Sequence, residues 1–442
     1  MAIKPIIIVG AGFAGLTAAL ELHRAGQPVI VLEARSRVGG RVYTLRDFDN
    51  GRCAEAGGEL IDANHRRVLA MAAQFGLPLE TVPGMDAWFS WLALDGRLGA
   101  DDDVSVWGVR LDEEVAKIEQ ALAELGERVS DPTNPQQAVN AAELDRMPVM
   151  AWLESLDVHP LAKKGFAARL RAEFLVEPAG HSTLDLARWG KMVPAQEEAT
   201  YHIRGGNDRL AQAIAGELPD LRLDSRVTAV RQEKAGVQVS YASDGRSIEL
   251  AAEEVVLAVP PGPMREIQFD PPLPPAYREM LAALRLGPVT KVILEYKRPF
   301  WDEASWSGLL LTDLPMNCIW LTAGGQAGEG GMLTVYTGGK PAADYSAMSD
   351  EDRVATVLAQ VESLFPGSSV YLKSSRTMAW LNEPLTQGGY LYFPPGSVTA
   401  YWNALRQPFG RLHFAGEHTA VYQGYMEGAI ESGQRAAAEI LA

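Results

Sequence analysis

Several features that would place this chain in other classes of protein are scarce or absent. Its 442 residues include only two cysteines, Cys53 and Cys318, which are too few for a disulfide framework and lack metal-ligand spacing. No apolar run approaches the roughly 20 residues of a membrane-spanning helix. The first residues lead straight into a strand pattern, so we expect no signal peptide. These absences predict a soluble protein of a reduced compartment, the cytoplasm, without a membrane partner.

Positive charge is also in deficit. The chain has 40 Lys and Arg against 56 Asp and Glu, a net charge of −16, and no basic cluster is interleaved with aromatic residues. This balance argues against nucleic acid as a partner, and it favours cationic substrates only weakly because acidity also serves solubility. The length exceeds that of one ordinary core and predicts two domains. A homodimer is left open.

What the chain does have is the pattern of a dinucleotide-binding unit at its start. An apolar strand at 6–9 is followed by the GAGFAG segment at 10–15, a helical segment at 16–25 and a second strand at 29–32 that ends at Glu33. The three glycines permit a tight turn, close approach of a pyrophosphate and close packing of helix on strand. The helix amino terminus offers free N–H groups to phosphates, and the acid accepts hydrogen bonds from ribose hydroxyls. This order predicts a Rossmann-like unit but does not separate FAD from NAD.

Two further glycine-rich segments point toward FAD. EARSRVGGR at 33–41 places paired glycines and arginines directly after the ribose-binding acid, and AGGE follows at 56–59. Paired glycines let the backbone run beneath a bulky ligand, and an arginine beside them can neutralise a pyrophosphate. The alternative for the first segment is a basic, solvated loop, which the second segment makes less favoured.

With these motifs the chain resembles the flavin-containing amine oxidases, the family of monoamine, polyamine and L-amino-acid oxidases. The matching segments are VGAGFAGL, VLEARSRVGGR, AGGE, LDSRVTAV, VVLAVPP, FDPPLP, VTKVILEYKRPFW, GGYLYFPPG, and FAGEHT followed by GYMEGAIESG. The resemblance implies an α/β fold in which a Rossmann-like FAD-binding domain is interleaved with an α+β substrate domain. We expect the FAD-binding domain at 1–75, 201–270 and 381–442, and the substrate domain at 76–200 and 271–380.

The resemblance also implies a set of cofactor contacts, which fall in the glycine-rich and carboxy-terminal motifs. They are Gly10, Gly12, Phe13, Ala14, Gly15, Glu33, Ala34, Arg35, Gly39, Gly40, Arg41, Gly57, Gly58, Glu59, Val227, Trp380, Gly416, Glu417, Tyr425, Met426 and Ala429. Monoamine oxidases of the family that bind flavin covalently use a cysteine directly before the tyrosine that matches Tyr390, and this chain has Gly389 there. We therefore expect FAD to be held non-covalently.

Three residues are expected to carry the chemistry. Tyr390 in GGYLYF and Tyr425 in GYMEG match two family side chains that stand nearly perpendicular to the flavin and form a cage around the amine. Lys291 in VTKVILEY matches a lysine that contacts flavin N5 through a water and assists the reaction with oxygen. The alternatives are ordinary core tyrosines and a lysine on the solvent face of a strand.

Substrate choice is the least determined property. The resemblance places Leu60 and Asp62, together with the two tyrosines, at the substrate site. L-amino-acid oxidases commonly have an arginine near Leu60, which this chain lacks, although Arg204 could serve instead. Polyamine oxidases often have an acid or histidine near Asp62 for a distal ammonium, but an N-cap role before the following helix explains Asp62 equally well. His65 and His418 are expected to be structural, or flavin neighbours without acid–base duty.

The function implied is an FAD-dependent oxidase of a primary or secondary amine with an apolar body. Hydride transfer to flavin N5 would give an imine and, with oxygen, hydrogen peroxide. The monoamine oxidases it resembles have a carboxy-terminal membrane anchor, which we do not expect here. The alternatives are an L-amino-acid or polyamine oxidase, a flavin-dependent desaturase or dehydrogenase that does not use oxygen, and a non-catalytic flavoprotein.

Overall fold

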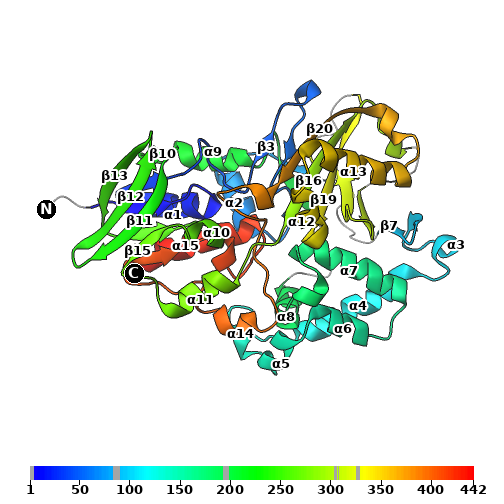
Figure 1. Ribbon diagram of the computed structural model, residues 1–442, viewed down its shortest axis with the longest axis horizontal. Helices are drawn as coiled ribbons and strands as arrows, with labels where there is room; N and C mark the ends of the chain where they lie inside the picture. The colour runs from blue at the N-terminus through cyan, green and yellow to red at the C-terminus, as the bar shows by residue number, and fades with distance from the viewer. Residues whose placement is uncertain (1–3, 83–89, 193–198, 303–305, 307, 325–328) are drawn as a thin grey trace.

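The chain folds into two lobes that lie side by side (Figure 1). The structure is a computed structural model, and it describes residues 4–82, 90–192, 199–302, 306, 308–324 and 329–442. The lobe at the left of Figure 1 is built on a parallel sheet, and the other lobe on a larger, mostly antiparallel sheet. This mixed architecture confirms the fold class expected from the sequence. The residue boundaries proposed for the two domains stay a prediction.

The first lobe is organised around a five-stranded parallel sheet. Its strand order is β10–β2–β1–β14–β21, so segments far apart in the sequence pair directly. The strands are β1 (Ile6–Val9), β2 (Val29–Leu32), β10 (Leu221–Arg222), β14 (Val255–Leu257) and β21 (Leu412–Phe414). All four residues of β1 are buried, as expected of a parallel strand that is covered on both faces.

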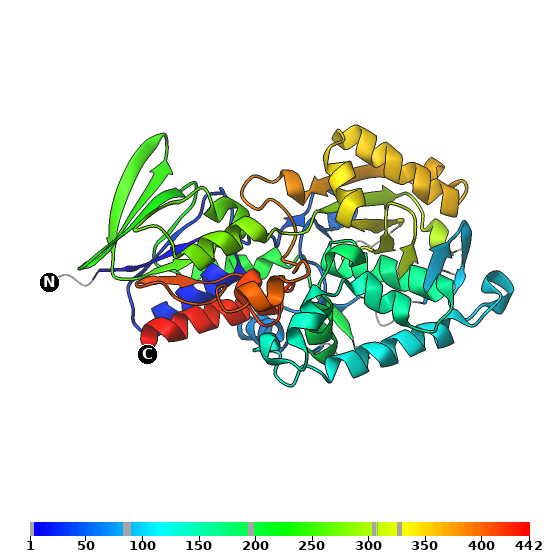
Figure 2. The same cartoon turned by 60° about the horizontal axis from the view of Figure 1, so that its bottom comes forward.

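Two helices from opposite ends of the chain pack together beside this sheet. They are α1 (Phe13–Arg24) and α15 (Met426–Leu441), and Figures 1 and 2 show α15 in red beside α1 in blue. A β-carbon on Gly433 would lie 2.3 Å from a backbone oxygen of α1, so this close approach requires glycine. The helix expected at 16–25 begins earlier than predicted, because Gly12 is its N-cap.

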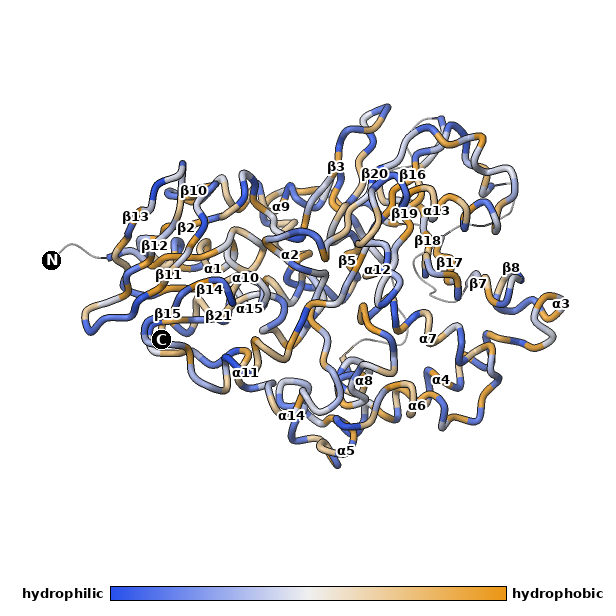
Figure 3. The backbone as a smooth tube through the Cα atoms, viewed as in Figure 1, coloured by the Kyte–Doolittle hydropathy of each residue, from blue (hydrophilic) through white to orange (hydrophobic). Residues whose placement is uncertain are grey.

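A four-stranded sheet with the order β13–β12–β11–β15 extends the first lobe. Its strands are β11 (Arg226–Glu233), β12 (Gly236–Ser243), β13 (Arg246–Ala252) and β15 (Gln268–Asp270). Most of β13 is exposed, and Figure 3 shows hydrophilic and hydrophobic residues interspersed along it. The inner strand β11 contributes Val227 to the cavity described below.

The second lobe is built on a seven-stranded sheet with the order β20–β16–β19–β18–β17–β7–β8. Its strands are β7 (Trp91–Leu94), β8 (Arg97–Ala100), β16 (Val289–Tyr296), β17 (Leu309–Thr312), β18 (Cys318–Leu321), β19 (Gly331–Gly338) and β20 (Leu372–Ala379). Every residue of β16 is buried, including Lys291. The main helices of this lobe are α4 (Leu111–Gly126), α7 (Pro160–Phe174), α8 (Thr183–Met192) and α13 (Asp350–Leu364).

Short elements connect and cap these layers. The short strands are β3 (Thr44–Leu45), β4 (Ala54–Glu55), β5 (Ile61–Asp62), β6 (Leu79–Thr81) and β9 (Thr200–Ile203). The other α-helices are α2 (Arg66–Gln74), α3 (Val104–Trp107), α5 (Ala141–Arg146), α6 (Val149–Ser155), α9 (Asp208–Gly216), α10 (Pro261–Met264), α11 (Pro275–Ala283), α12 (Gly339–Ser346) and α14 (Ser397–Tyr401). Within the described ranges, every helix is too short or too polar to span a bilayer.

Both cysteines are free and buried, which predicts inert thiols. Burial raises the pKa of the Cys53 thiol to about 11, and burial also raises the pKa of Cys318. Since the thiolate is the reactive form, neither group should react with Ellman's reagent in the native protein at pH 8. The same titration in denaturant should count two thiols. A thiol that reacts at a free-cysteine rate before unfolding would contradict this expectation.

Candidate active site

A cavity of about 910 Å³ collects nearly all of the predicted site residues. Its volume is near the upper end of the roughly 300–1,000 Å³ typical of ligand sites. The predicted residues that line it are Gly10, Gly12, Phe13, Ala14, Glu33, Ala34, Arg35, Gly39, Gly40, Arg41, Gly57, Gly58, Glu59, Leu60, Asp62, Val227, Lys291, Trp380, Tyr390, Gly416, Glu417, Tyr425, Met426 and Ala429. Of all the predicted site residues, only Gly15 does not line the cavity.

The glycine motif forms one wall as its spacing predicts. Gly10 has a positive φ of 103°, and a β-carbon on Gly15 would lie 1.9 Å from the Gly10 oxygen, so Gly15 acts by letting α1 pack against β1. A β-carbon on Gly12 would meet no atom within 4 Å, because this backbone opens onto the cavity. Gly40 approaches from the other side, where its β-carbon would lie 3.3 Å from the Gly12 Cα. The wall is therefore a cradle of bare backbone.

Glu33 lies at the carboxyl end of β2, where the motif places the ribose-binding acid. It is buried, and its two oxygens accept hydrogen bonds from the backbone N–H groups of Ala11 at 2.7 Å and Arg35 at 2.8 Å. A carboxylate can accept about four hydrogen bonds, so capacity remains for ligand hydroxyls. The Arg35 guanidinium is held by Thr386, at 2.8 Å.

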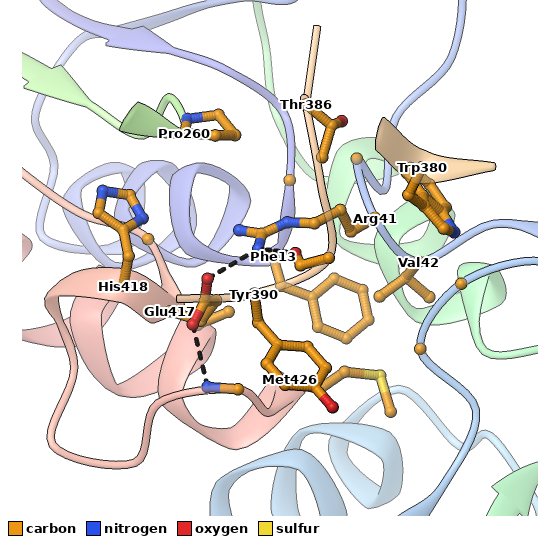
Figure 4. A pocket seen from close by; sticks show the side chains of 18 of the residues that line it. Phe13, Arg41, Val42, Pro260, Trp380, Thr386, Tyr390, Glu417, His418 and Met426 are labelled. Atoms are coloured by element: carbon orange, nitrogen blue, oxygen red, sulfur yellow. Dashed lines mark hydrogen bonds and ion pairs between the residues drawn. The ribbon is translucent and has the colours of Figure 1, made fainter. Parts of the chain in front are cut away.

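Arg41 and Glu417 form a polar network that reaches both predicted cage tyrosines. Arg41 Nη1 donates to the Gly389 carbonyl and, at 2.7 Å, to Glu417 Oε1. Glu417 Oε2 accepts from the Gly424 N–H at 2.9 Å. Figure 4 shows these contacts at the cavity wall. Because Gly389 and Gly424 each directly precede a cage tyrosine, one ion pair fixes the backbone at both positions.

Two buried polar atoms in the dinucleotide half of the cavity have no hydrogen-bond partner among the described residues. They are Nδ1 of His418 and Nε of Arg35, and both residues line the cavity. Burial lowers the pKa of His418 to about 4, so its ring is neutral near pH 7. Unsatisfied buried groups are costly unless a ligand or water meets them. Together with the glycine cradle and Glu33, these groups fit a large, polar dinucleotide.

The hydroxyls of the two cage tyrosines contact consecutive residues at the end of α7. Tyr390 donates to the Ala172 carbonyl at 3.1 Å, and its oxygen lies 3.0 Å from the Tyr336 hydroxyl. Tyr425 donates to the Glu173 carboxyl. Burial raises the pKa of both Tyr390 and Tyr425, so both hydroxyls are neutral. Their rings line one cavity, whereas an ordinary core tyrosine would face only packed side chains.

Lys291 lies deep in the second lobe rather than on a solvent face. Its side chain is 3% exposed, and Nζ donates to the Glu55 carbonyl at 3.1 Å, the Gly57 carbonyl at 2.9 Å and Glu59 Oε2 at 2.7 Å. Glu59 also accepts from the Trp320 indole at 3.0 Å. All three N–H groups of the ammonium thus have protein acceptors, so a bridging water would have to share one of them. The solvent-facing alternative for Lys291 is wrong.

Asp62 does not cap the following helix, which corrects one of the two interpretations weighed for it. The N-cap of α2 is His65, without a side-chain cap bond, and Asp62 pairs in strand β5 with β9. His65 Nδ1 accepts from the Asp62 N–H at 3.0 Å, and its ring lies 5.1 Å from that of Tyr425. Burial lowers the pKa of His65 to about 4. His65 therefore packs beside the cage as a neutral ring.

The arginine in the substrate half is not the one that the sequence suggested. Arg204 is exposed, pairs with Glu80 at 2.7 Å and does not line the cavity. Arg169 lines it instead, and pairs with Glu119 at 3.1 Å. Leu60 lines the cavity with an apolar side chain, at the position near which the resemblance led us to expect an arginine for an L-amino-acid oxidase.

Sequence reasoning missed most of the wall contributed by α4, α7 and α8. The missed residues on these helices include Asp112, Val115, Glu119, Arg169, Ala172, Glu173 and Trp189, and Asp101, between β8 and α3, was missed as well. Asp112, Val115 and Glu119 are spaced i, i+3 and i+7, so they share one face of α4. The only available signal was this spacing, which is also typical of a solvated helix face.

Comparison with known proteins assigns this arrangement to one family. Residues 13–441 match the family described as flavin containing amine oxidoreductase. Human amine oxidase [flavin-containing] B is 29% identical to this chain over 99% of the chain and 86% of its own length. Mouse L-amino-acid oxidase is 31% identical over 99% and 70%. A structure of putrescine oxidase bound to putrescine superposes with a TM-score of 0.88 at 25% identity, covering 99% of both chains.

Proposed function

The chain belongs to the flavin-containing amine oxidoreductases, and from this premise we propose that it is an FAD-dependent oxidase of a primary or secondary amine. The products would be an imine, which hydrolyses in water, and hydrogen peroxide. The observation that carries the proposal is that Tyr390, Tyr425 and Lys291 line the same cavity as the dinucleotide motif. A cytoplasmic location and a homodimer stay predictions.

The residues assigned to the cofactor are those of the glycine cradle, Glu33 and Arg41. When bound, the flavin supplies the acceptor for a hydride equivalent from the carbon beside nitrogen. The Glu33 carboxylate suits ribose hydroxyls, while Arg41 adds positive charge near the cradle for a pyrophosphate. The missing partners of His418 and Arg35 are consistent with a ligand of this polarity.

The protein's own part is to hold a neutral amine and to exclude water. Tyr390 and Tyr425 offer rings whose neutral hydroxyls point to α7, so their faces can orient the substrate without exchanging protons. A carboxylate directly at the reacting nitrogen would favour the unreactive ammonium form. Lys291 supplies a fixed positive charge at the cavity wall, which suits an oxygen molecule that gains negative charge.

The test of this function is a peroxide assay over amines, L-amino acids and polyamines, paired with anaerobic spectra. Amines should bleach the flavin absorbance without oxygen and should yield stoichiometric peroxide with it. Bleaching without peroxide would favour a dehydrogenase or desaturase. Turnover of L-amino acids alone would favour the amino-acid oxidase, which the apolar Leu60 position argues against.

We expect the flavin to be FAD and to leave the protein on acid precipitation. A β-carbon on Gly389 would lie 2.4 Å from Leu175 Cδ1 and 2.8 Å from Val289 Cγ1, so a side chain at the position of the covalent relatives' cysteine would require both neighbours to shift. The purified protein should be yellow, and the supernatant after acid precipitation should contain FAD, identified by its mass. The amount of FAD in that supernatant should equal the total released by complete proteolytic digestion of the same protein. Yellow colour that stays with the pellet would contradict this prediction.

A further inference from the structure

Glu173 is a carboxyl group in the substrate half of the cavity for which the proposed reaction has no use. It is the penultimate residue of α7, beside Trp189, and its Oε1 accepts the Tyr425 hydroxyl. Trp189 Nε1 points to the same hydroxyl at 3.4 Å. The carboxyl therefore lies at the hydroxyl end of the Tyr425 ring, not at the ring face that would hold the reacting nitrogen.

No basic side chain within the described part of the chain lies within 4 Å of Glu173. Arg169, one turn earlier on α7, pairs with Glu119 and acts on Glu173 only through space, where it lowers the pKa by less than burial raises it. A carboxylate that faces a cavity away from bulk water is costly without a cation. Burial accordingly raises the pKa of Glu173. Groups of this kind, held in a cavity and short of a counter-charge, are candidates for ligand recognition.

The surroundings of Glu173 also favour a cation. The carboxyl terminus of α7, with its partial negative charge, points at this end of the cavity, and the Ala172 carbonyl accepts a cage hydroxyl there. The cavity wall on α4 adds Asp112 and Glu119. Both of those carboxylates have arginine partners, Arg110 and Arg169. Among the described residues, Glu173 and Asp101 have no such partner within 4 Å, and of these two only Glu173 contacts a cage tyrosine.

We propose that Glu173 binds a second ammonium group of the substrate, which makes the preferred substrates diamines rather than monoamines. This inference rests on the proposed amine oxidation and adds the substrate class to it. One nitrogen of the diamine lies neutral between the tyrosine rings, while the other, protonated nitrogen donates to Glu173. Because the two subsites are separate, the same diamine can be neutral at the nitrogen that reacts and protonated at the nitrogen that binds Glu173.

The test compares 1,3-diaminopropane to 1,6-diaminohexane with propylamine to hexylamine, matched by chain length. In the native enzyme kcat/KM should be higher for at least one diamine than for its monoamine. Glu173→Gln should reduce that preference about 10–100-fold, mainly through KM for the diamine, because a charge-assisted hydrogen bond is lost. Thermal unfolding under anaerobic conditions gives a second readout: the diamine should raise Tm more than the monoamine, and only when Glu173 is present.

Two further variants separate recognition from structure. Glu177→Gln removes a half-exposed carboxylate just after the same helix, outside the cavity, and should keep the preference. Tyr425→Phe keeps the Glu173 carboxyl but removes its hydroxyl partner, and should keep the preference too.

Equal preference for the diamine in the native enzyme and in Glu173→Gln, in both kcat/KM and Tm shift, would overturn the inference while amine oxidation stands. Loss of the preference in Tyr425→Phe as well would show that Glu173 acts only through the tyrosine, and would also overturn it. If no amine is oxidised, the proposed function fails and the Tm shifts alone decide on Glu173.

Discussion

Lys291→Met is expected to slow the reaction of the reduced enzyme with oxygen on the order of 100-fold, the usual effect of removing one preorganised charge or donor. The ammonium is 3% exposed and is fixed by three acceptors, so its charge is held at the cavity wall without reorganisation. Anaerobic reduction by an amine needs no negative charge on oxygen, and it should change only a few-fold. Stopped-flow absorbance of the two half-reactions measures both rates.

The substitution also leaves the Glu59 carboxylate buried without its cation. Breaking a buried ion pair from one side typically costs about 3–5 kcal/mol, so the single variant should unfold at a lower temperature. Lys291→Met/Glu59→Gln removes the stranded charge and should recover stability without recovering the oxygen reaction. Lys373→Met is the matched control, because this lysine lies on the neighbouring strand β20, pairs with Asp49 and the buried Glu295, and does not line the cavity. Unchanged reoxidation in the double variant would remove Lys291 from the oxygen step.

The parts of this site that the sequence predicts are those made by neighbours along the chain. The strand, glycine turn, helix and acid between residues 6 and 33 form their contacts locally, as in the hydrogen bond from the Ala11 N–H to Glu33. Local spacing is sufficient there, because the motif specifies both the backbone turn and the ligand that fits it.

The parts that could not be predicted depend on tertiary packing. Glu173 contacts Tyr425 across 252 positions of sequence, and Lys291 contacts Glu59 across 232. The residue pattern of α7 does not indicate which face of the helix will contact Tyr390 and Tyr425, because both tyrosines lie far away along the chain. The N-cap interpretation of Asp62 failed for the same reason, since pairing of β5 with β9 placed it in a strand. The roles of individual residues in the substrate half of the cavity could therefore be assigned only once the fold was known.

Tyr425→Ala is expected to lower the rate of flavin reduction at saturating amine on the order of 100-fold, whereas Tyr425→Phe should keep much of the activity. The phenyl ring preserves the shape and the π-face of the cage and loses only the hydrogen bond to Glu173. Alanine leaves a void that admits water and lets the amine leave its reactive pose, and a misplacement of about 1 Å can cost about 100-fold in rate.

The comparison of Phe with Ala decides what kind of group Tyr425 is. Burial raises the pKa of its hydroxyl, so a phenolate base near pH 7 is not expected, and the ring alone should matter. Tyr422→Ala removes a ring that packs 5.1 Å from Tyr425, and should cost less than Tyr425→Ala because Tyr422 does not line the cavity. FAD content must be equal in all variants for the rates to be compared. If Phe proves as damaging as Ala, the hydroxyl carries a proton or a required hydrogen bond. If neither change alters the rate while FAD stays bound, the amine lies elsewhere and the cage assignment is wrong.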